Sequence, residues 1–214
     1  EVCCGALVHH LGREEAAKAA ARTNVAAWTR LIEAGGVDAV VATAAGCGTN
    51  LKAYGDLLAD DPAYAAKAAR VSALARDFSE VVEAFGLPAA GAPPVTVAYQ
   101  AACSLQHGQG LRETPARLLV QAGFVVKEPT EAHLCCGSAG TYNILEPDLS
   151  RRLRARKLDR LARLGADVVA TGNIGCLTPL SGGDGAPVVH VAELLDWACG
   201  GPAPEGLAQR ADRA

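Results

Sequence analysis

The chain has 214 residues, of which 50% are hydrophobic and only 4% aromatic, and its formal net charge is -3. This length is sufficient for one large or two small domains with a core built mainly from Ala, Val and Leu. The charge argues against a basic nucleic-acid-binding protein and against a strongly acidic solvating one. No apolar run reaches the roughly 18–20 residues needed to span a bilayer.

Helices and strands alternate along the first half. Residues 13–34 are rich in Ala, with apolar side chains at helical spacing, and predict a helix that ends at the following Gly-Gly pair. Residues 37–43 predict a buried strand, and residues 63–85 predict a second helix. The segment 86–94 is rich in Pro and Gly, so we expect it to separate two units of the chain.

The second half continues this alternation. Its predicted helices and strands are strand 95–99, helix 114–122, strand 124–126, helix 147–164, strand 167–171, strand 188–191 and helix 191–199. Such alternation is typical of a parallel sheet with right-handed crossover connections. We therefore expect an α/β protein with two units, 1–92 and 93–200, each with a parallel sheet flanked by helices, followed by a tail at 201–214.

Eight cysteines are more than a chain of this size carries by chance, yet too few for a small disulfide scaffold. Two pairs are adjacent, Cys3-Cys4 and Cys135-Cys136. Neighbouring cysteines make poor structural disulfides because the ring that would join them is strained. Vicinal cysteines instead bring two thiolates to one place, which suits a metal site.

An internal repeat organises the cysteines. Segments 36–51 (GVDAVVATAAGCGTNL) and 165–180 (GADVVATGNIGCLTPL) are almost alike, and Cys47 in the first matches Cys176 in the second. Each segment lies downstream of a Cys-Cys-Gly triplet. A duplicated unit is the simplest explanation.

The spacing within the two repeats is also similar. There are 42 residues between Cys4 and Cys47, and 39 between Cys136 and Cys176. The second unit has a further cysteine, Cys103, whose counterpart in the first unit would precede the first residue of the chain. We therefore expect the chain to be the C-terminal part of a longer protein.

The cysteines follow predicted strands. Cys47, Cys103 and Cys176 come four or five residues after a strand, and the remaining pair lies in the loop before helix 147–164. Because the carboxyl ends of parallel strands meet at one edge of a sheet, we expect these thiols to converge there. Thiolates favour an iron–sulfur cluster or zinc over hard cations. Long spacings and vicinal pairs favour a cluster over the tight pairs of structural zinc sites. Zinc, thiol redox chemistry and inert cysteines remain as alternatives.

These residues resemble a known family. The pattern C-x(n)-CCG-x(n)-C resembles the cysteine-rich CCG domain shared by the heterodisulfide reductase B subunit and several respiratory iron–sulfur proteins. Longer strings resemble the glycolate oxidase iron–sulfur subunits, and the resemblance covers essentially the whole chain: HGQGLRETPARLL (107–119), LCCGSAGTYNILEPDL (134–149), GADVVATGNIGCL (165–177) and HVAELLDWA (190–198).

The resemblance implies an oxidoreductase subunit that transfers electrons and is not itself catalytic. It would receive electrons from a flavin (FAD) subunit oxidising glycolate to glyoxylate and pass them toward a quinone, in the cytoplasm or at the inner face of the cell membrane. A lactate-utilisation complex, a heterodisulfide-reductase-like complex and a structural zinc module are the alternatives. The resemblance implies a [4Fe–4S] cluster in the second unit, with Cys103, Cys135, Cys136 and Cys176 as its ligands. It implies a further metal site in the first unit, with Cys3, Cys4 and Cys47 as ligands and zinc as an option.

The chain departs from this family in one respect. The reductase relatives bind a non-cubane cluster through five cysteines that end in C-x-x-C, and the last of these falls here at Asn50 and Pro179. Neither residue is a ligand of that kind. A four-thiolate site in the second unit remains feasible, whereas the first unit would need an additional ligand.

Other candidate residues have plainer alternatives. Cys199 lies outside both motifs, and we expect a small buried hydrophobic residue. His107 either donates a hydrogen bond to a cluster sulfur or is an ordinary loop residue. His9 and His10 are expected at the surface, unless one completes a zinc site. Helix 150–164 carries seven Arg and Lys residues and is either a solvated face or a docking face for an acidic partner or lipid headgroups.

Overall fold

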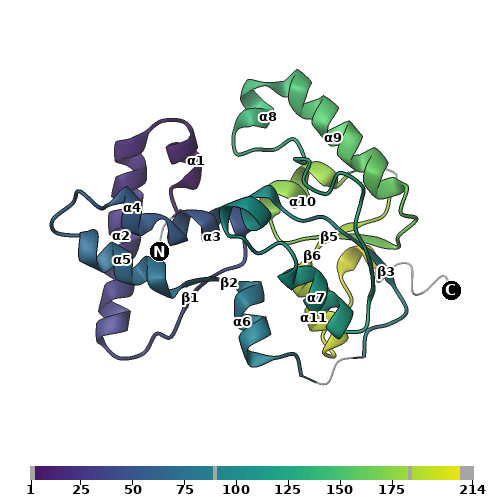
Figure 1. Cartoon of the computed structure of the whole chain (residues 1–214), viewed down its shortest axis with the longest axis horizontal. Coiled ribbons are helices and arrows are strands. Elements are labelled where there is room, and N and C mark those ends of the chain that lie inside the picture. Colours follow the sequence, from purple (N-terminus) through teal and green to yellow (C-terminus); the bar gives the residue numbers. More distant parts are fainter. Residues whose placement is uncertain (1–2, 89–90, 183–184, 208–214) are drawn as a thin grey trace. The chain divides into compact units, whose positions relative to one another are not determined.

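The computed structural model describes residues 3–88, 91–182 and 185–207. The chain divides into two compact units, Glu1–Phe78 and Ser79–Ala214. Each contains a parallel sheet with helices around it, so the predicted α/β class is confirmed (Figure 1). Within the described ranges, no helix has the length and apolar character needed to cross a bilayer.

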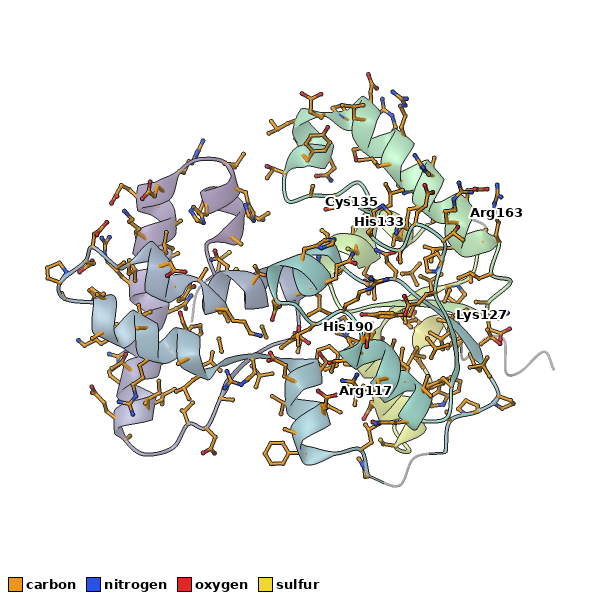
Figure 2. The ribbon with its side chains drawn as sticks, in the orientation of Figure 1. Arg117, Lys127, His133, Cys135, Arg163 and His190 are labelled. Atoms are coloured by element: carbon orange, nitrogen blue, oxygen red, sulfur yellow. The ribbon has the colours of Figure 1, made fainter. Side chains whose placement is uncertain are left out.

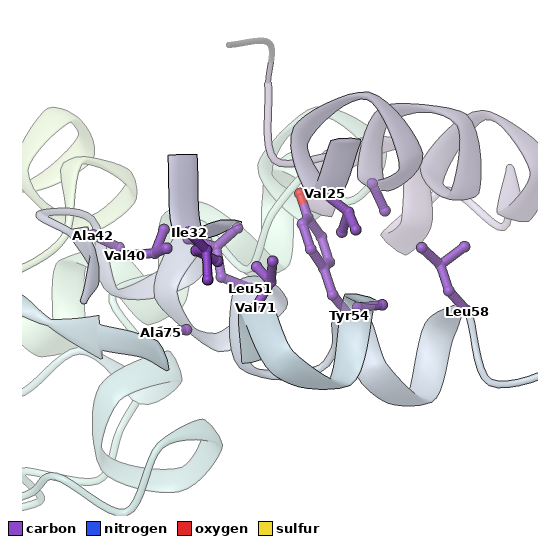
Figure 3. Close-up of a cluster of buried hydrophobic side chains, with 11 residues drawn as sticks. Val25, Ile32, Val40, Ala42, Leu51, Tyr54, Leu58, Val71 and Ala75 are labelled. Carbon is purple, nitrogen blue, oxygen red and sulfur yellow. The ribbon is translucent and has the colours of Figure 1, made fainter. Parts of the chain in front are cut away.

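The first unit is mainly helical around a small sheet. Its elements are α1 (Ala6–His10), α2 (Glu14–Glu33), β1 (Val40–Ala42), α3 (Ala45–Lys52), α4 (Tyr54–Leu57), α5 (Ala65–Leu74) and β2 (Ala75–Asp77). β1 and β2 pair in parallel. Side chains from α2, α4 and α5, including Val25, Tyr54 and Val71, are fully buried in one hydrophobic cluster that also contains residues of both strands (Figure 3). Because α2 and α5 pack their apolar faces together, the predicted helix at 13–34 forms as expected.

The prediction of one continuous helix over 63–85 is wrong. The segment forms α5, then β2, then α6 (Phe78–Phe85). Ala75 and Asp77 are fully buried while Arg76 points outward, and all three residues pair with β1. A strand of three residues is too short to leave a period-2 pattern in the sequence, so the helical pattern on both sides concealed it.

The second unit contains every element predicted for it, with ends displaced by at most two residues. Its elements after α6 are β3 (Thr96–Tyr99), the π-helix η1 (Ser104–Gly108), α7 (Thr114–Gln121), β4 (Val125–Lys127), α8 (Tyr142–Leu145), α9 (Pro147–Ala162), β5 (Val168–Thr171), α10 (Ile174–Leu180), β6 (Val188–His190) and α11 (Val191–Ala198). β3 and β5 form the buried centre of the sheet, where Val97, Ala98, Val168 and Ala170 are inaccessible to solvent.

The strand order of this sheet reverses direction between two neighbouring strands, β3 and β5. All strands are parallel in the order β4-β3-β5-β6. The chain leaves β3 toward β4 and leaves β5 in the opposite direction toward β6. Figure 1 shows α7 and α11 on one side of these strands and α9 and α10 on the other, as right-handed crossovers require. In such sheets, ligands bind beyond the carboxyl ends of the strands where the order reverses, here β3 and β5.

The structural division falls after Phe78, whereas the sequence analysis places the boundary at 92/93. The segment between these positions is tied to the second unit. Glu83 forms an ion pair with Arg117, and the backbone N–H of Gly91 donates to the carbonyl oxygen of Ala198 over 2.9 Å. Of the predicted tail, residues 208–214 lie outside the described residues.

Candidate metal centre

The Cys-Cys-Gly triplets have the same local structure in both units. Gly5 has a φ of 85° and Gly137 a φ of 94°, in the left-handed region that favours glycine. A Cβ on Gly137 would lie 2.5 Å from the carbonyl oxygen of Ser150 in α9, and a Cβ on Gly5 would lie 3.3 Å from that of Ala17 in α2. In each unit, glycine therefore lets the loop turn after its two cysteines and pack directly against the next long helix.

The third cysteine of each repeat also has an equivalent position. Cys47 is the third residue of α3, the helix that follows β1, and Cys176 is the third residue of α10, the helix that follows β5. Both therefore lie in the first turn of a helix just beyond the carboxyl end of a strand. The sequence repeat is thus also a structural repeat.

The four predicted ligands of the second unit form a series of neighbouring thiols. The sulfurs of Cys136 and Cys176 are 3.3 Å apart. The thiol of Cys135 is close enough to those of Cys103 and Cys136 for both of them to lower its pKa. All four are free thiols; Cys136 and Cys176 are only 2% exposed, and the other two are half-buried. Figure 2 labels Cys135 in the loop between β4 and α8.

The four cysteines of the second unit contact one another in a row and do not surround a common centre. Within residues 3–88, 91–182 and 185–207, no three His, Cys, Asp or Glu side chains are grouped in a way that could hold a metal ion. The thiols in their present arrangement are therefore neighbours at one edge of the sheet, and a closed coordination shell would require their side chains to turn toward a common centre.

Polar groups of the surrounding loops point at the sulfurs. The backbone N–H of Gly137 donates to the sulfur of Cys135 over 3.3 Å, and the amide of Asn173 donates to the sulfur of Cys176 over 3.8 Å. Such donors stabilise negative charge on sulfur and are one of the means by which proteins set the potential of a cluster.

Because the thiols lie close together, their pKa values move in opposite directions. Neighbouring thiols lower the pKa of Cys135 and of Cys176. The thiol of Cys135, together with burial, raises the pKa of Cys103 and of Cys136. Deprotonation is therefore easier at Cys135 and Cys176 than at Cys103 and Cys136. A soft metal that bound all four would displace those protons, because coordinating thiols are deprotonated outright.

The donor set fits an iron–sulfur cluster. Four free cysteines from three segments of the chain supply only soft sulfur ligands, which select iron–sulfur clusters or zinc. They lie after β3, β4 and β5, at the edge where the strand order reverses. Hydrogen bonds to the sulfurs and the burial of two thiols are features by which proteins set the reduction potential of such a cluster.

One face of α9 supports the loops that carry these cysteines. Ser150 Oγ donates to the carbonyl oxygen of Gly137 over 2.8 Å. One turn later, the guanidinium of Arg154 donates to the carbonyl oxygens of Pro179 and Ser181, at the end of the helix that carries Cys176. A single helix thus holds both the Cys-Cys-Gly loop and α10.

Two further turns of α9 hold the chain before the cysteine pair. Lys157 is fully buried, and its Nζ donates to the carbonyl oxygens of Glu131 over 3.3 Å and of Ala132 over 3.1 Å. The Glu131 carboxylate binds Arg156 and Arg160. The expected solvated face fits the exposed Arg151, Arg152, Arg156 and Arg163, whereas Lys157 is buried against the loop.

The first unit brings together a smaller set of thiols. The thiols of Cys4 and Cys47 are neighbours, and their interaction lowers the pKa of Cys47 to about 7 and raises that of Cys4. Cys3 is exposed and Cys4 and Cys47 are half-buried. Three thiols are one fewer than the four ligands of a structural zinc site.

A buried polar network positions this first triplet. Asn50 Nδ2 and the hydroxyl of Tyr54 both donate to the carbonyl oxygen of Cys4, over 2.6 Å and 2.8 Å. Asn24 Nδ2 donates to the carbonyl oxygen of Cys3 over 3.3 Å. Asn50 stands where the resembled family has its last cysteine, and here it holds the loop through its amide.

The other candidates lie outside the thiol groups. His9, His10 and His107 are exposed, as expected of surface or loop residues. Cys199 is half-buried at the carboxyl end of α11, so it is less buried than predicted. His190, labelled in Figure 2, caps α11 by accepting a hydrogen bond from the backbone N–H of Ala192.

Sequence reasoning missed the residues that support the site. Asn173, Lys157 and Glu131 act through hydrogen bonds to a sulfur or to the loops that carry the cysteines. The sequence offers only a weak signal for them: Asn173 lies two residues before the Gly-Cys step, and Lys157 is one of seven basic residues in its helix.

Comparison with known proteins agrees with this geometry. The model of the CCG cysteine-rich domain family matches residues 1–52 and 97–181. The "Glycolate oxidase iron-sulfur subunit" of Escherichia coli (strain K12) is 40% identical over 197 residues, covering 92% of this chain and 48% of that protein. The "Probable glycolate oxidase iron-sulfur subunit" of Bacillus subtilis (strain 168) is 36% identical over 211 residues, covering 94% and 47%. The chain spans about half the length of these two relatives.

A third relative is of a different kind. The "Lactate utilization protein A 2" of Bacillus mycoides (strain KBAB4) is 27% identical over 204 residues, covering 92% of this chain and 83% of that protein. The family match extends over more than half of the chain and includes the cysteine-rich segments of both units. On this evidence, the chain belongs to the CCG cysteine-rich domain family.

Proposed function

We propose that this chain is the electron-transferring, cysteine-rich part of the iron–sulfur subunit of a glycolate oxidase. The observation that carries the proposal is the series of four free thiols beyond β3, β4 and β5, which has the donor chemistry of a cluster site. The 40% identity to a glycolate oxidase iron–sulfur subunit supports the same assignment.

The residues that would hold a [4Fe–4S] cluster are Cys103, Cys135, Cys136 and Cys176. When bound, the cluster supplies reversible one-electron storage. The chain's own groups prepare the site for this role. The nearly complete burial of Cys136 and Cys176 keeps water from one side, while the N–H of Gly137 and the amide of Asn173 stabilise negative charge on two sulfurs.

In this proposal, electrons come from an FAD-containing subunit that oxidises glycolate to glyoxylate and leave toward a quinone. The complex would lie in the cytoplasm or at the inner face of the cell membrane. Cys103 and Cys135 are the half-buried members of the group, so electrons would enter or leave on their side. The chain would bind and orient the group that carries the electron, and it would make or break no bond in the substrate.

The first unit would hold a second metal site. Cys3, Cys4 and Cys47 supply three thiolates, and the buried amides and hydroxyl around them position the loop. Zinc or iron bound there would take its fourth ligand from outside these three cysteines.

A lactate-oxidising complex is the second candidate. The observation that favours it is the similarity to a lactate utilization protein, of which this chain covers 83%. The identity of 27% to that protein, against 40% to the glycolate oxidase subunit, places glycolate first.

The test uses the full-length protein with its flavoprotein partner, purified without oxygen. We expect iron and acid-labile sulfide, and an electron paramagnetic resonance signal that glycolate generates faster than lactate does. Cys136→Ser should remove about four iron atoms, the content of one cluster. Cys199→Ser, a change at a cysteine outside both thiol groups, should remove none.

Two outcomes would replace the proposal. Faster generation of the signal by lactate would assign the chain to the second candidate. Zinc without iron, in a complex that still oxidises its substrate, would make the chain a structural zinc module.

A further inference from the structure

The two repeats differ in charge at one equivalent buried position. Asn24 lies seven residues after Ala17 in α2, and Lys157 lies seven residues after Ser150 in α9. Ala17 and Ser150 are the residues whose carbonyl oxygens face the glycine of each Cys-Cys-Gly triplet. Because seven residues are about two helical turns, Asn24 and Lys157 occupy the same place relative to their triplets.

Both side chains donate to backbone carbonyl groups, Asn24 within its triplet and Lys157 in the loop just before its triplet. Asn24 is 1% exposed and donates to the carbonyl oxygen of Cys3. Lys157 is 0% exposed and donates to the carbonyl oxygens of Glu131 and Ala132. In the first unit a neutral amide is sufficient to hold the loop. The positive charge in the second unit therefore needs a separate explanation.

A buried ammonium group is unfavourable unless negative charge lies near it. The carboxylate of Glu131 is already bound by Arg156 and Arg160. Burial lowers the pKa of Lys157. Its Nζ donates to the carbonyl oxygen of Ala132, three residues before Cys135, so the ammonium group lies beside the loop that carries the cysteine pair.

We propose that Lys157 compensates the negative charge of the group held by the four cysteines of the second unit, and so raises its reduction potential. This inference rests on the proposed iron–sulfur site. One-electron reduction adds one negative charge to the cluster. A fixed positive charge in low-dielectric surroundings stabilises the reduced state more than the oxidised one. The first unit, with Asn24 at this position, has no such compensation there.

The test compares three variants of the full-length protein. Lys157→Gln removes the charge but keeps an N–H donor for the two carbonyl groups, and Lys157→Arg keeps the charge. Arg152→Gln removes an exposed charge from the same helix and is the matched control. Iron and sulfide are quantified, and the midpoint potential is measured by redox titration followed by electron paramagnetic resonance.

We expect Lys157→Gln to retain iron and to shift the midpoint to lower potential. A tenfold change in the one-electron equilibrium constant, which is 59 mV, is the expected order of magnitude, about the effect of one partly screened charge. Lys157→Arg and Arg152→Gln should titrate at the wild-type potential. If Lys157→Gln loses its iron while Lys157→Arg retains it, the charge is required for the cluster to bind, which also supports the proposal.

Other results would overturn it. An iron-loaded Lys157→Gln protein at the wild-type potential would refute the role of Lys157 and leave the iron–sulfur site intact. Loss of iron in both Lys157 variants would show that the shape of lysine matters and its charge does not. A wild-type protein without iron would refute the proposed function itself.

Discussion

Glu131 holds the loop before the cysteine pair against α9, and its own backbone has an unfavourable conformation. Its φ of 61° lies in the left-handed region, which residues with a Cβ adopt rarely. Its carboxylate binds Arg156 and Arg160, and its carbonyl oxygen accepts a hydrogen bond from Lys157. The two guanidinium groups lower its pKa from 4.5 to about 2. One residue therefore connects the loop to three positions within about one turn of α9.

This depressed pKa predicts a pH-dependent contribution to stability. The charged form of Glu131 stabilises the folded chain fully above the unfolded-state pKa of about 4.5, and the contribution falls as the pH approaches about 2. We expect Glu131→Gln to lower the unfolding temperature at pH 6, with a difference from wild type that shrinks steadily toward pH 3. Thermal unfolding at a series of pH values measures this. Glu128→Gln, at an exposed position on the same loop, should show no such dependence; a Glu131→Gln deficit that is constant with pH would contradict the account.

Sequence reasoning reached the cysteines but not the residues that support them. Cysteines are rare enough that two vicinal pairs and a repeated Gly-Cys step stand out. Lys157 and Arg152 look alike in a sequence, because both belong to the same basic run. Only the fold buries one and exposes the other. Asn50 is a similar case: it could be excluded as a metal ligand, but its hydrogen bond to the carbonyl oxygen of Cys4 depends on contacts between distant segments.

At the scale of elements, each unit pairs a tight Cys-Cys-Gly turn with one long helix. Gly137 and Gly5 have similar positive φ values and meet the carbonyl oxygens of Ser150 and Ala17. The contact is closer in the second unit, where Ser150 also donates to the carbonyl oxygen of Gly137. The loop can approach the helix only because it has no side chain at that position.

We therefore expect Gly137→Ala to be strongly destabilising. The left-handed backbone alone costs roughly 1–2 kcal/mol for a residue with a Cβ, and overpacking adds about 1–3 kcal/mol. Gly165→Ala is the matched control, since Gly165 has a φ of 56° but no atom within 4 Å of the added Cβ. Chemical denaturation should show a loss of unfolding free energy for Gly137→Ala at least twice that for Gly165→Ala. Equal losses would mean that the contact with α9 is unimportant.

Elements with long patterns were predictable and short ones were not. α2 and α9 carry several turns of periodic sequence, and their predicted ends are within two residues of the observed ones. β2 has three residues and exists because it pairs with β1, which no local pattern specifies. The π-helix η1 that follows Cys103 is likewise invisible in the sequence, although it shapes the loop that carries this cysteine.

At the scale of the molecule, the two units share one arrangement of cysteines but differ in the number of cysteines and in buried charge. Both units place a Cys-Cys-Gly turn before a long helix and a third cysteine in the first turn of the helix after a strand. The second unit adds Cys103 and a buried cation, whereas the first has three cysteines and a neutral polar network. We expect this asymmetry to make the second unit the cluster-bearing one.

X-ray absorption spectroscopy at the iron and zinc edges, on protein purified without oxygen, tests this claim most directly. The account predicts iron in the wild-type chain, with sulfur as its only first-shell ligand and neighbouring iron atoms in the next shell. Cys135→Ser and Cys176→Ser should remove this signal, and Cys199→Ser should leave it unchanged. Zinc bound by sulfur with no iron, or iron bound mainly by nitrogen and oxygen, would contradict the account.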